Sequence, residues 1–252
     1  MMFVTMVQKG KISLELMTSW KDERLTYANK TYDEDSQEMF NIIQDKKIDK
    51  NIKEFLINYF FVRTVNYIEN YYRNMVRVTI DNFKIDPKGI LPNDEITLSI
   101  LEFEKIKKEY RSKKGWIISH NFNFQNIDEI NSVLSKLFQT DFFMNLSKEL
   151  NKIKLHSKFS NDAFYFNWKS FREIFKTRHE IVHRTRNSTF TLFQLDECRL
   201  FALYFVMIGN YVTATLILKK YKEKKLTRNK RYEYLVQYTK TFHKAHPTLL
   251  IS

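Results

Sequence analysis

The stretch F-R-E-I-F-K-T-R-H-E-I-V-H-R-T-R, residues 171–186, decides which fold the rest of the chain is expected to adopt. It ends a pattern in which large side chains recur every three or four residues, the spacing that places them on one face of an α-helix. That face consists of Phe164, Trp168, Phe171, Phe175, Arg178 and Val182. We predict a long amphipathic helix that begins near Ser160 or Asn161 and whose buried face runs directly into a cluster of arginines and histidines.

Helical patterns of the same kind lie on both sides of this stretch. Two long ones run from about Asn51 to Phe83 and from about Phe193 to Lys224. Two short helices are expected after Asp128, the second capped by Thr140 or Asp141. In the first long helix the residues expected in the core are Ile52, Leu56, Tyr59, Phe60, Tyr67, Ile68, Tyr71 and Met75. The chain has only 4 glycines and 3 prolines, which also favours helices over a many-stranded fold.

Three other segments carry weaker patterns. A short strand or coil is expected before a helix that starts near Tyr32 or Asp33. The alternation from Trp116 to Phe124 indicates a short extended segment. Asn66 and Glu69 lie among the aromatic residues of the first long helix, where they are either exposed or face a polar site, and we expect them to be exposed.

The formal net charge of the chain is +13, which indicates a polyanionic partner, either nucleic acid or an acidic membrane surface. The most basic segment runs from Lys219 to Lys244, where ten lysines or arginines and only two glutamates are interleaved with aromatic residues. This segment is either a solvated helix or a phosphate-binding arm with stacking rings. The residues expected to bind nucleic acid there are Lys219, Lys220, Arg228 and Arg231.

The single cysteine, Cys198, excludes an intramolecular disulfide and a cysteine-rich zinc module. The apolar N-terminal run is too short for a secretory signal, and no apolar run reaches the roughly 20 residues that a membrane span needs. We therefore expect a cytoplasmic protein that has no membrane partner.

Two hypotheses compete for the arginine–histidine cluster. His179-Glu180-Ile181-Val182-His183 matches H-E-x-x-H, in which two histidines on one helical face hold a zinc ion and the glutamate acts as general base. The first hypothesis is therefore a zinc metalloprotease. A catalytic zinc needs a third protein ligand; Glu197 is a candidate, but nothing around it in the sequence marks it as a ligand. Arg178, Arg184 and Arg186 would surround the site with positive charge, which opposes binding of a dication.

The second hypothesis rests on Arg178 and His183, with the polar His179 directly after the arginine. This string, R-H-E-I-V-H at the end of a long amphipathic helix, resembles the signature of the HEPN ribonuclease family and looks closest to its RiboL-PSP branch. An earlier stretch, F-F-V-R-T-V-N-Y-I-E-N-Y-Y-R at residues 60–73, resembles the partner helix of the HEPN bundle. The resemblance covers about residues 50–225. It implies an all-α, up-and-down helical bundle, a homodimer, and cleavage of RNA without a metal or other cofactor.

The chemistry that the resemblance implies suits these residue types. RNA supplies its own nucleophile, the 2′-hydroxyl, so the protein needs a proton acceptor and a cation beside the phosphorus. His183 is then the acid–base group, Arg178 the phosphate clamp, and His179 either orients one of them or contacts RNA. The products would be a 2′,3′-cyclic phosphate and a 5′-hydroxyl. Arg184 and Arg186 are expected to contact the RNA.

Helix geometry adds a constraint, because five residues subtend about 140° and Arg178 and His183 therefore do not share a face of a regular helix. Either the helix frays at the motif or the arginine side chain reaches round it. A two-fold dimer that pools two motifs in one cleft would relieve this constraint. The remaining alternative is a non-catalytic, basic, nucleic-acid-binding helical module.

The resemblance also implies a toxin or anti-phage defence effector with an antitoxin or defence-system partner protein. Toxins of this fold that a nucleotidyltransferase silences usually carry a tyrosine two residues after the histidine. Here that position is Thr185, so adenylylation at this site is not expected. We expect an N-terminal extension over residues 1–34, a HEPN-like helical domain over 35–225 and a basic C-terminal extension over 226–252.

Overall fold

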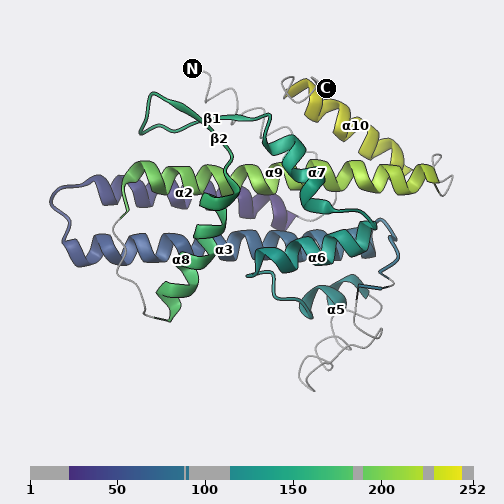
Figure 1. Ribbon diagram of the computed structural model, residues 1–252, viewed down its shortest axis with the longest axis horizontal. Coiled ribbons are helices and arrows are strands. Elements are labelled where there is room, and N and C mark those ends of the chain that lie inside the picture. The colour runs from purple at the N-terminus through teal and green to yellow at the C-terminus, as the bar shows by residue number, and fades with distance from the viewer. Residues whose placement is uncertain (1–22, 88, 91–113, 184–189, 224–229, 246–252) are drawn as a thin grey trace.

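The computed structural model describes residues 23–87, 89–90, 114–183, 190–223 and 230–245, which form a helical bundle with one small β-ribbon (Figure 1). The helices are α2 (Glu23–Gln44), α3 (Lys50–Asp81), α5 (Lys114–His120), α6 (Ile127–Phe138), α7 (Phe142–Leu150), α8 (Trp168–Val182), α9 (Leu192–Glu223) and α10 (Lys230–Ala245). The strands are β1 (Lys154–His156) and β2 (Ala163–Tyr165), which pair antiparallel. Apart from this ribbon the described part of the chain is all-α, which confirms the expected fold class.

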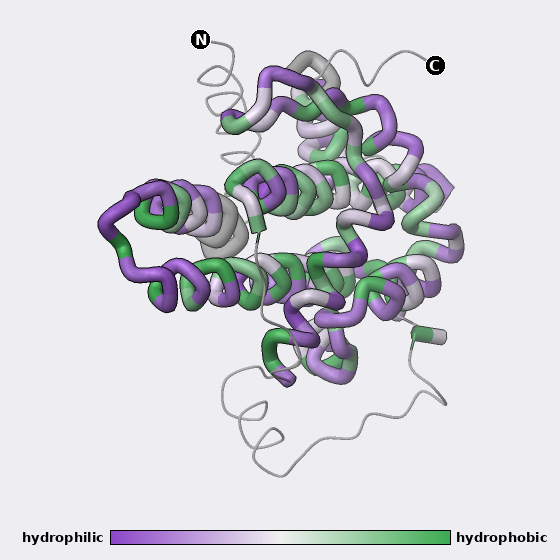
Figure 2. Tube along the Cα trace, turned by 60° about the vertical axis from the view of Figure 1, so that its left-hand side comes forward, coloured by the Kyte–Doolittle hydropathy of each residue, from purple (hydrophilic) through white to green (hydrophobic). Residues whose placement is uncertain are grey.

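Three long helices make the centre of the bundle, because α2 and α3 pack against each other and both contact α9. They run side by side in Figure 1, while α8 crosses α3 and α9, and α10 packs on α9. Hydrophobic and hydrophilic positions alternate along the helices in Figure 2, as amphipathic helices around a shared core require.

Helix α9 is apolar enough, by length and composition, to cross a membrane. Most of its apolar stretch is buried inside the bundle, and the core helix of a soluble protein passes the same test. Cys198 on this helix packs against the core, where burial raises the pKa of its thiol well above the ordinary value. The thiol is therefore a neutral packing group rather than a nucleophile.

Gly209 of α9 allows a close approach of Tyr72 from α3. A Cβ at this position would lie 2.2 Å from the hydroxyl oxygen of Tyr72, which donates a hydrogen bond to the carbonyl oxygen of Phe205 at 2.9 Å. Gly209→Ala is therefore expected to lower the free energy of unfolding by about 1–3 kcal/mol through overpacking. Urea denaturation measures this loss. Adding Tyr72→Phe removes the clashing hydroxyl oxygen, so the double variant should regain part of the lost free energy of unfolding. A double variant that is no more stable than Gly209→Ala would contradict the explanation.

Several helices lie where the sequence predicts them. Helices α3 and α9 each begin and end within two residues of the expected positions. Asp141 caps α7, as expected, by accepting a hydrogen bond from the backbone N–H of Met144 at 2.9 Å. Apolar periodicity over about nine turns, as in these two helices of 32 residues, is a local signal, so both could be predicted without knowing their neighbours.

Other expectations are wrong. Helix α2 begins at Glu23, so the helix start expected near Tyr32 or Asp33 falls inside it. Lys114–His120 is helix α5, where an extended segment was expected. Helix α8 begins at Trp168 rather than near residue 160, because the preceding Ala163–Tyr165 pairs with β1 as a strand.

The outer face of the N-terminal half of α3 carries large apolar side chains in solvent. Ile52, Phe55 and Tyr59 are 50%, 66% and 47% exposed. Their spacing of three and four residues places them on one face, and the rings of Phe55 and Tyr59 stack with centroids 6.3 Å apart. The core positions predicted for Ile52 and Tyr59 are therefore wrong, because the helices that cover α3 pack on its other faces.

For Asn66 and Glu69, the two polar residues of α3 that were expected to be exposed, the prediction fails in the opposite direction. Glu69 is buried and accepts a hydrogen bond from Nη2 of Arg73 at 2.7 Å. The guanidinium of Arg73 lies 5.9 Å from the ring centroid of Phe124, in the segment between α5 and α6. Asn66 is half-buried. Neither residue is exposed as expected, because α5 and α8 pack on α3.

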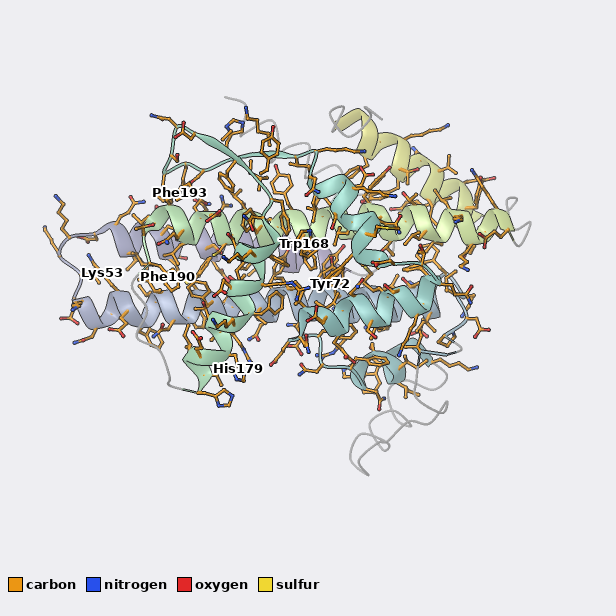
Figure 3. All side chains as sticks on the ribbon, viewed as in Figure 1. Lys53, Tyr72, Trp168, His179, Phe190 and Phe193 are labelled. Atoms are coloured by element: carbon orange, nitrogen blue, oxygen red, sulfur yellow. The ribbon has the colours of Figure 1, made fainter. Side chains whose placement is uncertain are left out.

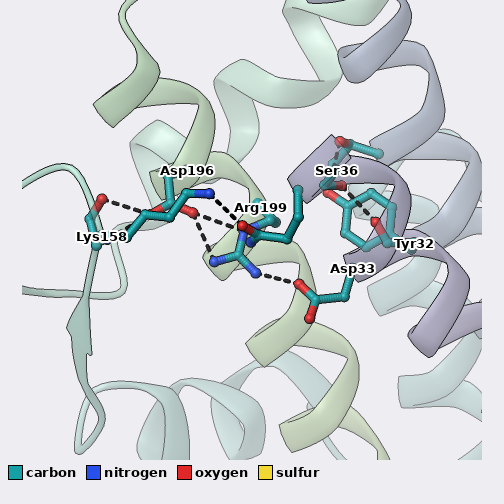
Figure 4. A network of polar contacts seen from close by, with 9 residues as sticks. Tyr32, Asp33, Ser36, Lys158, Asp196 and Arg199 are labelled. Carbon is teal, nitrogen blue, oxygen red and sulfur yellow. Dashed lines mark hydrogen bonds and ion pairs between the residues drawn. The ribbon is translucent and has the colours of Figure 1, made fainter. Parts of the chain in front are cut away.

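A buried polar network ties the β-ribbon to the bundle (Figure 4). Asp196 of α9 is fully buried and accepts a hydrogen bond from Nε of Arg199 at 2.8 Å. Its other oxygen accepts from the hydroxyl of Ser157 at 2.7 Å and from the backbone N–H of Lys158 at 3.1 Å. Arg199, which is also buried, pairs in addition with Asp33 of α2. The network thus joins α2, α9 and the loop between the two strands.

Candidate active site

Helix α8 positions the arginine–histidine motif. Its N-terminus is capped by Asn167, whose side chain accepts hydrogen bonds from the backbone N–H groups of Lys169 at 2.9 Å and Ser170 at 3.2 Å. Phe171 then packs into the core, with its ring centroid 4.5 Å from that of Phe205 on α9. One end of α8 is therefore fixed in the bundle, and the other end projects beyond α3 (Figures 1 and 3).

The helix ends inside the motif. Val182 is the last residue of α8, and His183 is its C-cap with φ −87° and ψ 5°. The backbone N–H of His183 still donates a hydrogen bond to the carbonyl oxygen of His179 at 3.1 Å. His183 therefore keeps the helical hydrogen bond, and its side chain still lies about 140° around the helix axis from that of Arg178, so the arginine side chain has to reach round the helix or a second copy has to supply the partner group.

Two imidazoles lie side by side at this helix end. His179 and His183 are both exposed, and their ring centroids are 4.3 Å apart with 53° between the ring planes. His179 projects from the end of α8 away from the bundle (Figure 3). Imidazole is the side chain best suited to proton transfer near neutral pH, so this pair can carry acid–base chemistry on a substrate bound at the surface.

Arg178 precedes the imidazoles and is half-buried. Its Nε is out of contact with solvent and has no hydrogen-bond partner among the described residues. The three functional side chains predicted from the sequence thus share one helix end, with a cation and two proton-transfer groups close to solvent.

The zinc hypothesis lacks a third ligand in the part of the chain that the structure describes. No group of three His, Cys, Asp or Glu side chains there could hold a metal ion. Glu180 lies 3.9 Å from the ammonium group of Lys176. Glu197, the candidate from the sequence, is half-buried on α9, where desolvation raises the pKa of its carboxyl group.

Of the residues expected to bind nucleic acid, Lys219 and Lys220 are the two whose side chains the structure describes, and both lie near the C-terminal end of α9. Those that lie outside the described residues are Arg184, Arg186 and Arg228, and the side chain of Arg231 is not described either. Lys219 is exposed near the end of α9. Its neighbour Lys220 donates a hydrogen bond to Oε1 of Gln139 at 2.8 Å and lies 3.8 Å from the carboxylate of Glu223.

The basic C-terminal segment forms α10, which uses its apolar face for packing. Leu235, Tyr238 and Phe242 are buried. The hydroxyl of Tyr238 accepts a hydrogen bond from Nδ2 of Asn210 at 2.8 Å, and the ring of Phe242 stacks on that of Tyr211 at 4.5 Å. This arrangement favours the solvated-helix interpretation, because the rings expected to stack on bases are used in the core. In Figure 1, α10 and the motif end of α8 lie at opposite corners of the bundle.

Comparisons with known proteins place the chain in a family. No curated protein and no solved structure matches it. A model of the RiboL-PSP-HEPN family, however, matches residues 30–211, which is well over half of the chain and includes α8 with its motif. HEPN domains are often ribonucleases, so the match indicates a nuclease or other RNA-related function. The chain therefore belongs to the RiboL-PSP-HEPN family.

Proposed function

We propose that this protein is a metal-independent endoribonuclease that cleaves RNA by attack of the 2′-hydroxyl, leaving a 2′,3′-cyclic phosphate and a 5′-hydroxyl. The observation that carries the proposal is the pair of exposed imidazoles next to Arg178 at the projecting end of α8, in a chain of the HEPN family. The formal charge of +13 supports it, because a basic protein attracts a polyanionic substrate.

Each residue of the motif has a role in this reaction. His183 accepts the proton of the 2′-hydroxyl as that oxygen attacks the phosphorus, and the bond to the 5′-oxygen breaks as that oxygen takes up a proton from water. The guanidinium of Arg178 binds the non-bridging oxygens, whose negative charge grows in the transition state. His179, with its ring 4.3 Å from that of His183, orients this histidine or contacts the RNA.

The proposal includes a homodimer in which two motifs share one cleft. Val182, the residue before His183, is 49% exposed at the end of α8, and α8 packs on α3. Ile52, Phe55 and Tyr59 form a second exposed apolar surface, on the same helix α3 against which α8 packs. Clustered exposed apolar side chains mark interaction sites, so we place the second copy of the chain against this face of α3.

Phe55→Glu tests the dimer surface. Because a charge at the centre of an apolar interface must be desolvated, the dissociation constant of the dimer is expected to rise at least about thirtyfold. Size-exclusion chromatography with light scattering measures the change. Met144→Glu is a matched control, because Met144 is 52% exposed on α7, away from this surface. A wild-type protein that is an active monomer, or a Phe55→Glu variant that dimerises normally, would exclude this interface.

Cleavage assays with and without EDTA test the chemistry. The proposal requires RNA cleavage that survives chelation and leaves cyclic phosphate ends. Loss of activity on chelation, with stoichiometric zinc in the purified protein, would instead support the metalloenzyme. Binding of RNA with no cleavage under any condition would support the non-catalytic module.

We further propose a cytoplasmic toxin or anti-phage defence effector that a partner protein restrains. The support is the family and the chemistry, because an exposed ribonuclease motif needs control in the cell. Since Thr185 stands where related toxins carry a tyrosine, that control would not act by modification of this position. Expression in bacteria should arrest growth, and an inactive motif variant should not.

A further inference from the structure

The β-ribbon presents a face that the motif does not use. Strands β1 and β2 pair with Lys154 opposite Tyr165 and Leu155 opposite Phe164. Because side chains alternate along a strand, Lys154, His156 and Tyr165 project from one face and Leu155 from the other. Leu155 is buried, and the ring of Phe164 packs toward α9, so the face with the lysine, histidine and tyrosine is the outer one.

The three residues of this outer face are free for a ligand. Lys154 and His156 are exposed, and Tyr165 has 57% of its surface in solvent. Within the described residues none of the three takes part in a hydrogen bond, an ion pair or a ring contact. The surrounding segment from Asn151 to Lys169 holds four lysines and one aspartate. The outer face therefore combines an unpaired cation, an imidazole and an exposed ring in a basic neighbourhood.

The ribbon is held rigidly although it is only three residues long on each strand. Asp196 fixes the loop between the strands through the hydroxyl of Ser157 and the backbone N–H of Lys158. The ammonium group of Lys158 donates a hydrogen bond to Gln37 of α2 and lies 5.3 Å from the ring centroid of Phe40. A platform fixed in this way orders a bound ligand at low entropic cost.

We propose that the outer face of the β-ribbon, formed by Lys154, His156 and Tyr165, binds the single-stranded part of the RNA that the motif cleaves, with Lys154 on a phosphate and the Tyr165 ring stacked on a base. Base stacking on an exposed aromatic ring and phosphate contact by a neighbouring cation are the two elements of single-strand binding. A protein partner fits less well, because three side chains are far fewer than the 20–30 residues of a stable protein interface.

This inference rests on the proposed ribonuclease function and extends it to the choice of substrate. Two residues, Phe166 and Asn167, connect β2 to α8, so the ribbon lies at one end of α8 and the motif at the other (Figure 1). The 15 residues of α8 span about 22 Å, a distance that several nucleotides of an extended strand can bridge. The ribbon therefore contacts nucleotides remote from the cleaved bond, and it favours substrates with a single-stranded extension.

Binding measurements test the platform in the His183→Ala background, which keeps the RNA intact. Lys154→Glu and Tyr165→Ser are each expected to weaken binding of a single-stranded oligonucleotide about tenfold, measured by fluorescence anisotropy. Lys154→Glu should also reduce the slope of log affinity against log salt by at least about 0.7. Lys136→Glu is the matched control, because it makes the same charge change at an exposed position on α6 and should leave affinity unchanged.

Cleavage kinetics separate this inference from the function on which it rests. With His183 intact, the ribbon variants should raise KM for a long oligonucleotide, leave kcat unchanged, and cleave a dinucleotide like wild type. Unchanged binding and unchanged KM in both ribbon variants would overturn the platform even if the protein is a ribonuclease. Wild-type protein that binds the oligonucleotide through the ribbon but cleaves nothing would overturn the ribonuclease function alone. Wild-type protein that binds no single-stranded RNA would overturn the platform.

Discussion

Replacing His183 with alanine is expected to lower the rate of RNA cleavage by about 10²- to 10⁴-fold, the contribution that a positioned acid–base group makes. The side chain is exposed at the C-cap of α8, so its loss removes no core packing. Thermal unfolding and RNA affinity should therefore stay close to those of wild type. Single-turnover cleavage of a labelled RNA, with excess protein, measures the chemical step without interference from product release.

The same assay on variants of Arg178 tests whether this residue binds the phosphate through its guanidinium group or only contributes positive charge. Arg178→Ala should lose cleavage to a similar degree, and Arg178→Lys should recover only part of it, because lysine keeps the charge without the two-pronged contact. His120→Ala is the matched control, since His120 is an exposed histidine on α5 whose Nδ1 lies 2.8 Å from the carbonyl oxygen of Trp116. Cleavage that persists in both the Arg178 and the His183 variants would show that these residues are not the catalytic site.

The largest stability effect is expected at Asp196. Asp196→Ala should lower the free energy of unfolding by about 3–5 kcal/mol, because it leaves the buried guanidinium of Arg199 without its main partner. The hydroxyl of Ser157 and the N–H of Lys158 would lose their acceptor as well. Taken from the roughly 5–15 kcal/mol of stability typical of a domain, this loss leaves about 0–12 kcal/mol, and urea denaturation of the variant and of wild type measures the difference.

A double variant shows whether the loss of stability comes from the unpaired charge of Arg199. Asp196→Leu combined with Arg199→Met replaces the pair by apolar side chains, which is often neutral or stabilising when the volume is kept. The double variant should therefore be more stable than Asp196→Ala. A single variant that loses less than about 1 kcal/mol would mean that Asp33, which also pairs with Arg199, satisfies the charge by itself.

Local patterns in the sequence predicted much of the bundle. Helices α3 and α9 carry apolar residues over many turns, and such a period is visible without any tertiary information. The cap of α7 at Asp141 was predictable for the same reason, because a capping side chain contacts backbone only a few residues away. The arginine–histidine motif was also a local signal, and the structure places it at one helix end.

The β-ribbon could not be predicted from these patterns. Phe164 falls on the apolar face of the motif helix when that pattern is extended backward, and the sequence therefore favours helix there. In the structure its ring packs against Phe193 and Phe201 of α9, and β2 pairs with β1. Strands of three residues carry too little periodicity to be recognised, so contacts with the bundle select this conformation over the helix.

By itself the sequence determined where the long helices lie, which chemical groups stand in the motif and how basic the chain is, because these depend on residue type and on spacing along one helix. Only the tertiary structure decided which faces of those helices meet solvent. It left Phe55 and Tyr59 exposed, buried Glu69 with Arg73, and separated α10 from the motif. The physical reason is that burial depends on which neighbours pack on a face, and those neighbours are distant in the sequence.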